Sequence, residues 1–192
     1  IVYAIVNPMR VTLTQLNENI AREMRERHLQ IVEILQNVAN NHFSQLEVSC
    51  QDILSIVNQQ LIPGNIDPEA KVDFMRLQGD LCRYVNEFAP EKRKEFYQVR
   101  CKSVYSEAYK IASTQCPPHS LTRLALVLNY TMFLAETLNE VHDAVIPFLQ
   151  NETSAHQFFL SLKNIITYRP LLYHHYCHLL STISNEIKSI SN

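Results

Sequence analysis

The chain has 192 residues, a formal net charge of −2 from 17 basic and 19 acidic side chains, and only two glycines. Such a small net charge excludes broad attraction to nucleic acid or to an anionic membrane, and no apolar run approaches the roughly 20 residues that cross a bilayer. The scarcity of glycine and the absence of GxGxxG, GxxxxGK[ST], GxSxG and HExxH patterns argue against nucleotide-binding and common hydrolase sites. We therefore expect an all-α protein that uses no cofactor.

Prolines divide the chain, because a proline lacks the amide donor that continues a helix. Pro8 near the start is one such expected helix end. The intervening apolar periodicity predicts helices over residues 11–35, 41–61, 69–88, 91–114 and 121–138. Asp67 followed by Pro68 is typical of a helix start, and Ser120 precedes the fifth helix. Further helices are predicted at 141–149, 154–167 and 171–190.

The long helices and short connections predict one domain over residues 1–192, built as an antiparallel helical array. Within it, we expect four aromatic side chains of the helix at 91–114 to lie in the core: Phe96, Tyr97, Tyr105 and Tyr109.

The cysteines indicate a reducing compartment, and hence a cytoplasmic location, because they are odd in number, widely spaced and form no CxxC pair. They are Cys50, Cys82, Cys101, Cys116 and Cys177. The chain opens with IVYAIV, without an initiator methionine or a basic leader, and is interpreted as a trimmed fragment.

Neither a metal site nor a catalytic site is predicted. His174 and His178 have the i, i+4 spacing that can bind zinc on a helix, but no third ligand stands at a characteristic spacing. Cys82 lies beside Arg83, yet no base or orienting partner for a nucleophile can be identified.

Two stretches place polar groups on helix faces that can wall a groove. In FMRLQGDLCRYVNEF (74–88), Arg76, Asp80, Arg83 and Glu87 fall at i, i+4, i+7 and i+11 and share one side of the helix. In RLALVLNYTMFLAETLN (123–139), a mixed face is formed by four residues: Ala125, Asn129, Met132 and Glu136.

Arg83 and Tyr84 suit a phosphorylated side chain. A guanidinium donates two parallel hydrogen bonds to a phosphate and stays charged when partly buried, and a tyrosine hydroxyl adds a donor without adding charge. Glu87, one turn further along, is expected to hold the Arg83 guanidinium in an i, i+4 ion pair.

These segments also resemble a known family. GDLCRY, VNEF and RLALVLNYTMFLAETLN, with CQDILSIVNQQLIP, KVDFMRLQGD and VYSEAYKIAS, are similar to the phosphopeptide-binding core of the 14-3-3 proteins. The resemblance is strongest over residues 45–140 and weaker over 1–44 and 145–192.

The resemblance implies a concave groove and a role for several residues in it. It assigns the phosphate to Arg83 and Tyr84, and also to Arg10, the arginine nearest to the place of one that the family carries on its third helix. A lysine that the family uses for phosphate falls at Ala4 or Ile5 in this chain. The other implied groove residues are Asn129 for the peptide backbone, Leu128 and Met132 for flanking side chains, Glu136, and Arg76 at the groove edge. On its last helix the family has an asparagine and a tryptophan that hold the ligand. Asn185 stands in place of that asparagine, and this chain has no tryptophan.

The implied function is that of a signalling adaptor that binds phosphorylated proteins and catalyses nothing. Family members form homo- or heterodimers through their first two helices, and the match here begins near the third, so the resemblance does not extend to the dimerisation segment and dimerisation is not inferred from it. Two alternatives remain open: a degenerate member that binds partners without phosphate, and a tetratricopeptide-like helical scaffold.

Overall fold

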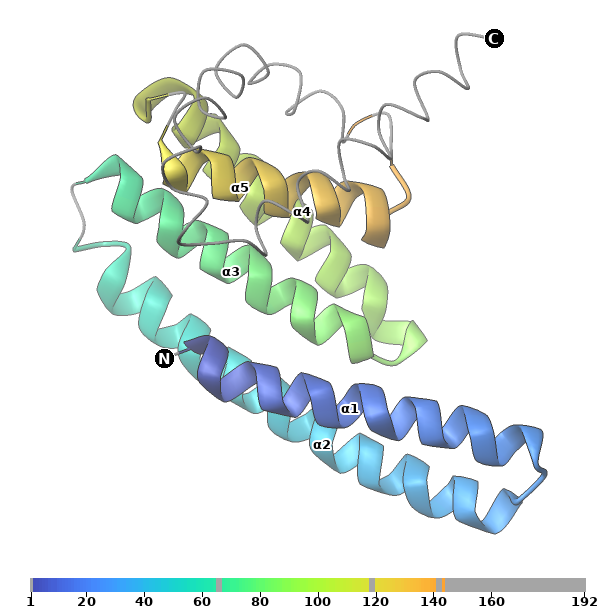
Figure 1. Ribbon diagram of the computed structural model, residues 1–192. Helices are drawn as coiled ribbons and strands as arrows, with labels where there is room; N and C mark the ends of the chain where they lie inside the picture. Colours follow the sequence, from blue (N-terminus) through green and yellow to red (C-terminus); the bar gives the residue numbers. More distant parts are fainter. Residues whose placement is uncertain (1, 65–66, 118–119, 141–142, 144–192) are drawn as a thin grey trace, which may run out of the picture. The chain divides into compact units, whose positions relative to one another are not determined.

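The computed structural model describes residues 2–64, 67–117, 120–140 and 143, and this part of the chain contains helices and no strand. The described residues form two compact units: residues 2–64 with 77–101, and residues 67–76 with those from 102 onward. Figure 1 shows the helices in chain order. None of the described helices is both long enough and apolar enough to cross a bilayer. The predicted all-α class is confirmed, whereas the helices predicted at 141–149, 154–167 and 171–190 lie outside the described residues.

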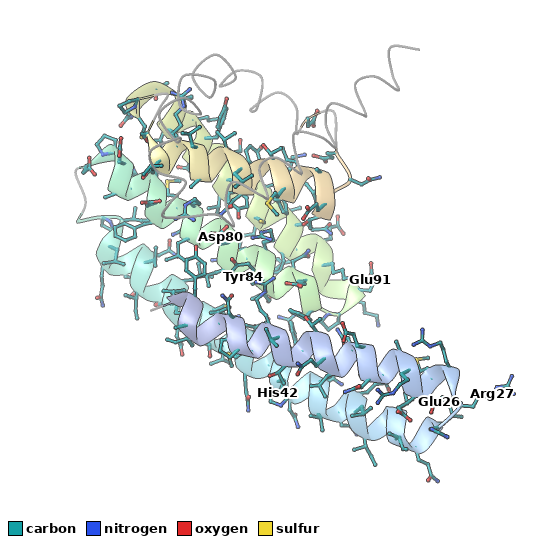
Figure 2. All side chains as sticks on the ribbon, in the orientation of Figure 1. Glu26, Arg27, His42, Asp80, Tyr84 and Glu91 are labelled. Carbon is teal, nitrogen blue, oxygen red and sulfur yellow. The ribbon has the colours of Figure 1, made fainter. Side chains whose placement is uncertain are left out.

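The first unit begins with an antiparallel helix pair, α1 (Val2–Arg25) and α2 (Leu29–Ile56), which pack along each other (Figure 1). Residues 26–28 make the turn between them, where Figure 2 labels Glu26 and Arg27. Arg27 adopts a left-handed φ of 62°. The His28 amide donates to the Glu23 carbonyl at 3.0 Å and the Arg27 amide to the Met24 carbonyl at 3.2 Å. This is the Schellman arrangement that closes a helix C-terminus.

The predicted bounds of the first two helices were wrong for identifiable reasons. Residues 11–35 were expected to be one helix, but the Schellman turn ends α1 at Arg25. The left-handed position of this turn is occupied by Arg27, where glycine is usual, so the sequence carried no signal that a helix ends here. Pro8 was expected to end a helix and instead lies inside α1. The carbonyl that loses its amide donor there belongs to Ala4, which is exposed, so water can satisfy it.

The rest of the first unit comprises a π-helical extension of α2, η1 (Val57–Leu61), residues 77–88 of α3 (Pro68–Phe88) and residues 91–101 of α4 (Glu91–Gln115). Each long helix supplies fully buried side chains to its core, among them Val6, Leu13, Leu46, Leu81 and Cys101. A polar contact joins α2 to α4, where Glu47 accepts from both Arg93 and Tyr97.

The second unit contains the first part of α3, the last part of α4, α5 (Leu121–Met132) and its π-helical extension η2 (Phe133–Thr137). Both predicted helix starts are confirmed. The Asp67 carboxylate accepts from the Ala70 amide at 2.9 Å, and the Ser120 hydroxyl accepts from the Arg123 amide at 3.1 Å. The Arg123 side chain is buried and donates to the Cys116 carbonyl at 3.1 Å, near the C-terminus of α4.

The aromatic residues of α4 divide between the core and the surface. Tyr97 and Tyr105 are buried as predicted, and Tyr109 is half-buried. Phe96, predicted to be in the core, is 62% exposed. Steps of three or four residues place Tyr97, Cys101, Tyr105 and Ala108 on the buried face of α4, and Phe96 lies about a quarter turn off that stripe.

Candidate functional site

Tyr84 of α3, labelled in Figure 2, has cationic and aromatic side chains of the first unit around it. The ring of Tyr84 is buried to 7% exposure, and the Arg10 guanidinium of α1 lies over it, 4.0 Å from the ring centroid. The Arg83 guanidinium lies 4.9 Å from the same centroid. Cations at these distances are attracted by the negative face of the ring. The three predicted phosphate-binding residues are therefore brought together in one cluster.

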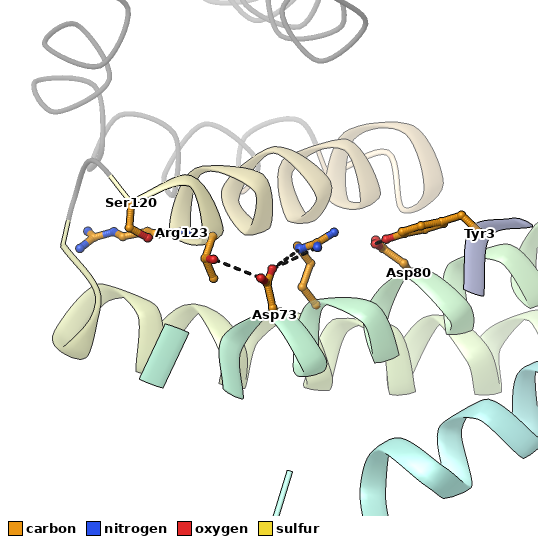
Figure 3. A network of polar contacts seen from close by, with 7 residues as sticks. Tyr3, Asp73, Asp80, Ser120 and Arg123 are labelled. Carbon is orange, nitrogen blue, oxygen red and sulfur yellow. Dashed lines mark hydrogen bonds and ion pairs between the residues drawn. The ribbon is translucent and has the colours of Figure 1, made fainter. Parts of the chain in front are cut away.

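Asp80 lies beneath this cluster as a fully buried carboxylate. It accepts from the Tyr3 hydroxyl of α1 at 2.9 Å, and Figure 3 shows the phenol directed at the carboxylate. Its other oxygen is 3.9 Å from Nη2 of Arg83. Because a buried carboxylate needs donors and a countercharge, these contacts fix Arg83 beside Tyr84.

Glu87 has a different partner from the one predicted. It was expected to pair with Arg83 one turn earlier on α3, but it accepts from Nη2 of Arg10 at 2.7 Å and from Nε of Arg10 at 3.0 Å. The prediction was wrong because sequence spacing considers only neighbours on one helix. In the folded unit, α1 brings an arginine to the same carboxylate.

An open concavity of about 670 Å³ follows one face of α1, lined by residues that include Tyr3, Ala4, Asn7 and Val11. Ala4, one of the two positions where the resemblance places a phosphate-binding lysine, contributes only a methyl group to this wall. The adjoining cluster contains two arginines and two carboxylates, so its formal charge is balanced. The electrostatic attraction available to an anion is thus weaker than a pocket with an additional lysine would supply.

Arg76, predicted at the groove edge, lies in the second unit. Its Nη2 and Nε donate to the Asp73 carboxylate at 3.1 and 3.2 Å, and the same carboxylate accepts from the Thr122 hydroxyl at 3.2 Å (Figure 3). Asp73 therefore links the first part of α3 to α5.

The other predicted groove residues of the second unit lie on α5 and η2. Asn129 and Met132 are half-buried, Leu128 is buried, and Glu136 on η2 is exposed. The predicted Asn185 lies outside the described residues.

Sequence reasoning missed Tyr3 as a member of the cluster. Tyr3 also contacts the Tyr84 ring edge-on, with centroids 6.5 Å apart. Its hydrogen bond to Asp80 spans 77 positions. No local spacing could have signalled it, because periodicity reports only residues within a few turns.

Comparisons with known proteins show which sequences the chain resembles. The sequence profile of the family described as 14-3-3 protein matches residues 2–159. The chain is 33% identical over 128 residues to 14-3-3 protein I of Plasmodium falciparum, a match that covers 67% of this chain and 44% of that protein. It is 31% identical over 118 residues to the 14-3-3 protein homolog of Neospora caninum, covering 62% and 44%. It is also 33% identical over 101 residues to human 14-3-3 protein beta/alpha, covering 53% and 41%. The matched segment thus spans less than half the length of each relative.

Proposed function

Because this chain belongs to the 14-3-3 family, we propose that it is a non-catalytic adaptor that binds segments of other proteins carrying phosphoserine or phosphothreonine. The observation that carries the proposal is the convergence of Arg10 and Arg83 on the ring of Tyr84. A phosphate there would receive charge-assisted hydrogen bonds from two guanidinium groups held in place by Glu87 and Asp80.

The family resemblance assigns the peptide backbone to Asn129, whose amide both donates and accepts. Leu128, Met132 and Glu136 would contact the flanking side chains. We place this activity in the cytoplasm, because four of the cysteines are free thiols, as expected in a reducing compartment.

A second candidate function, partner binding that does not depend on phosphate, is favoured by one observation. Both arginines of the cluster already have a carboxylate partner, and Ala4 supplies no charge at one of the two positions matching the family's lysine. A dianionic phosphate would have to compete with Asp80 and Glu87 for the same guanidinium groups.

One titration separates the two candidates. Fluorescent pools of serine-centred peptides, phosphorylated and unphosphorylated, are titrated with the protein and followed by anisotropy. Phosphate-dependent binding predicts at least about tenfold tighter binding of the phosphorylated pool, with an affinity that falls as salt is raised. Arg83→Gln and Arg10→Gln should each lower that affinity about five- to tenfold, as expected for loss of a partly exposed charge-assisted contact.

Arg25→Gln is the matched control, because it removes an equal charge from an exposed position at the end of α1. Asn129→Ala should lower the affinity for the phosphorylated and the unphosphorylated peptide pool by the same factor. Equal affinity for the two pools, unchanged by Arg83→Gln, would support the phosphate-independent function instead.

A further inference from the structure

A second cavity lies inside the first unit, between α2, α3 and α4, with a volume of about 280 Å³. One face of α2 lines it with Glu47, Cys50, Gln51 and Leu54. One face of α4 lines it with Arg93, Phe96, Tyr97 and Arg100. Cys82 and Val85 of α3 complete its wall. At about 100° per residue, these two positions lie on the opposite side of α3 from Arg83, Tyr84 and Glu87. The cavity is therefore separate from the candidate phosphate site.

The interior of the cavity is apolar. Leu54, Val85, Cys50 and Cys82 are all at most 6% exposed. Burial raises the pKa of the Cys50 thiol to about 12 and also raises that of Cys82, so both are neutral and behave as small apolar groups. The largely exposed ring of Phe96 extends this apolar surface outward.

The charged side chains of the cavity wall, Glu47, Arg93 and Arg100, have a net formal charge of one positive unit. Arg93 is held by Glu47 and by the Tyr97 hydroxyl, so its charge is balanced. Arg100 is exposed and makes no ion pair or hydrogen bond with any residue in the described part of the chain. Arg100 is one of the residues that line the cavity, so this charge stands on its wall.

We propose that this cavity binds a small monocarboxylate with an apolar body, with the carboxylate at Arg100 and the body against Leu54, Val85 and Phe96. Among the described residues, one cation of this wall has no partner and suits one negative charge, and the Glu47 carboxylate on the same wall opposes a phosphate dianion. The volume is near the lower end of small-molecule sites. At about 30 Å³ for each water-sized group, it accommodates roughly nine or ten non-hydrogen atoms.

Octanoate, a carboxylate of this size, and its neutral counterpart 1-octanol test the proposal on the whole 192-residue chain. Each is titrated below its aggregation limit and followed by NMR of backbone amides and methyl groups. We expect saturable shifts centred on Leu54, Val85 and the amides around Phe96, with octanoate binding more tightly than octanol. Arg100→Gln should weaken octanoate binding about three- to tenfold and leave octanol unchanged.

Two further variants complete the design. Arg25→Gln removes an equal charge outside the cavity and should change neither ligand's affinity. Gln51→Trp, at an exposed position of the wall, should fill the opening of the cavity. It should therefore lower the affinity for both ligands without altering the buried core. The proposal is overturned if octanoate causes no saturable shifts at this cavity, or if Arg100→Gln leaves its affinity unchanged.

Discussion

Tyr3 and Arg10 of α1 each reach a carboxylate of α3, Asp80 and Glu87, across 77 positions of sequence. The two contacts differ in burial, since Asp80 is fully buried and Glu87 remains partly exposed. A hydrogen bond to a buried carboxylate stabilises a fold more than an exposed ion pair does, because an unpaired buried charge is costly. At the residue scale, the Tyr3 hydroxyl therefore anchors the cluster around Tyr84 more strongly than the Arg10–Glu87 pair does.

Tyr3→Phe should lower the free energy of unfolding by about 1 to 2 kcal/mol, because it removes one donor to Asp80 and keeps the ring that meets Tyr84. Urea denaturation measures the effect. Asp80→Asn and the double variant complete a double-mutant cycle, which isolates the coupling between the two side chains. Strictly additive effects would show that the hydroxyl and the carboxylate do not interact.

At the scale of elements, the turn between α1 and α2 contains a residue in an energetically unfavourable backbone conformation. Arg27 has a φ of 62°, a region that costs an L-residue with a side chain about 1 to 2 kcal/mol relative to glycine. Its side chain is exposed, so nothing in the packing requires an arginine there.

Arg27→Gly should therefore raise the free energy of unfolding by about 0.5 to 1 kcal/mol, after allowing for the greater chain entropy of glycine in the unfolded state. The same substitution at Arg25, which has helical geometry, should lower it by up to about 1 kcal/mol. Thermal unfolding of the two variants compares them directly. A destabilised Arg27→Gly protein would mean that this residue does not close α1 in the left-handed conformation.

At the scale of the whole molecule, both units bury free thiols: Cys50, Cys82 and Cys101 in the first and Cys116 in the second. Burial raises the pKa of each of these thiols, that of Cys50 to about 12. The folded protein therefore holds these protons more tightly than the unfolded chain does, so its stability is fully present below the ordinary thiol pKa of about 8.5.

The free energy of unfolding should accordingly fall as the pH rises above about 8.5, and for Cys50 the loss should continue until about pH 12. In that range the Cys50 thiol contributes a loss of about 1.4 kcal/mol per pH unit, and the other buried thiols act in the same direction. Urea denaturation at pH 7, 8.5 and 10 measures the slope. Cys50→Ala should make the slope shallower, whatever its effect on absolute stability. A free energy that does not change between pH 8.5 and 10 would contradict the burial of the thiols.

Much of the fold was predictable because helix signals are local. The start of α3 at Asp67–Pro68 and that of α5 at Ser120 were both read correctly from cap residues. The first two helices were not, because α1 tolerates Pro8 and because the turn that follows its end at Arg25 has Arg27, rather than a glycine, in the left-handed position. Phe96 was misplaced because four aromatic residues on one helix do not all share its buried face.

The sequence by itself determined the helical class, the starts of α3, α4 and α5, and the adjacency of Arg83 and Tyr84, since each depends on residues within a turn or two of one another. Only the tertiary structure decided that Glu87 pairs with Arg10, that Tyr3 donates to Asp80, and that Arg100 stands beside an apolar cavity. Those contacts join helices far apart in the chain, and their geometry follows from how whole helix faces pack rather than from any local pattern.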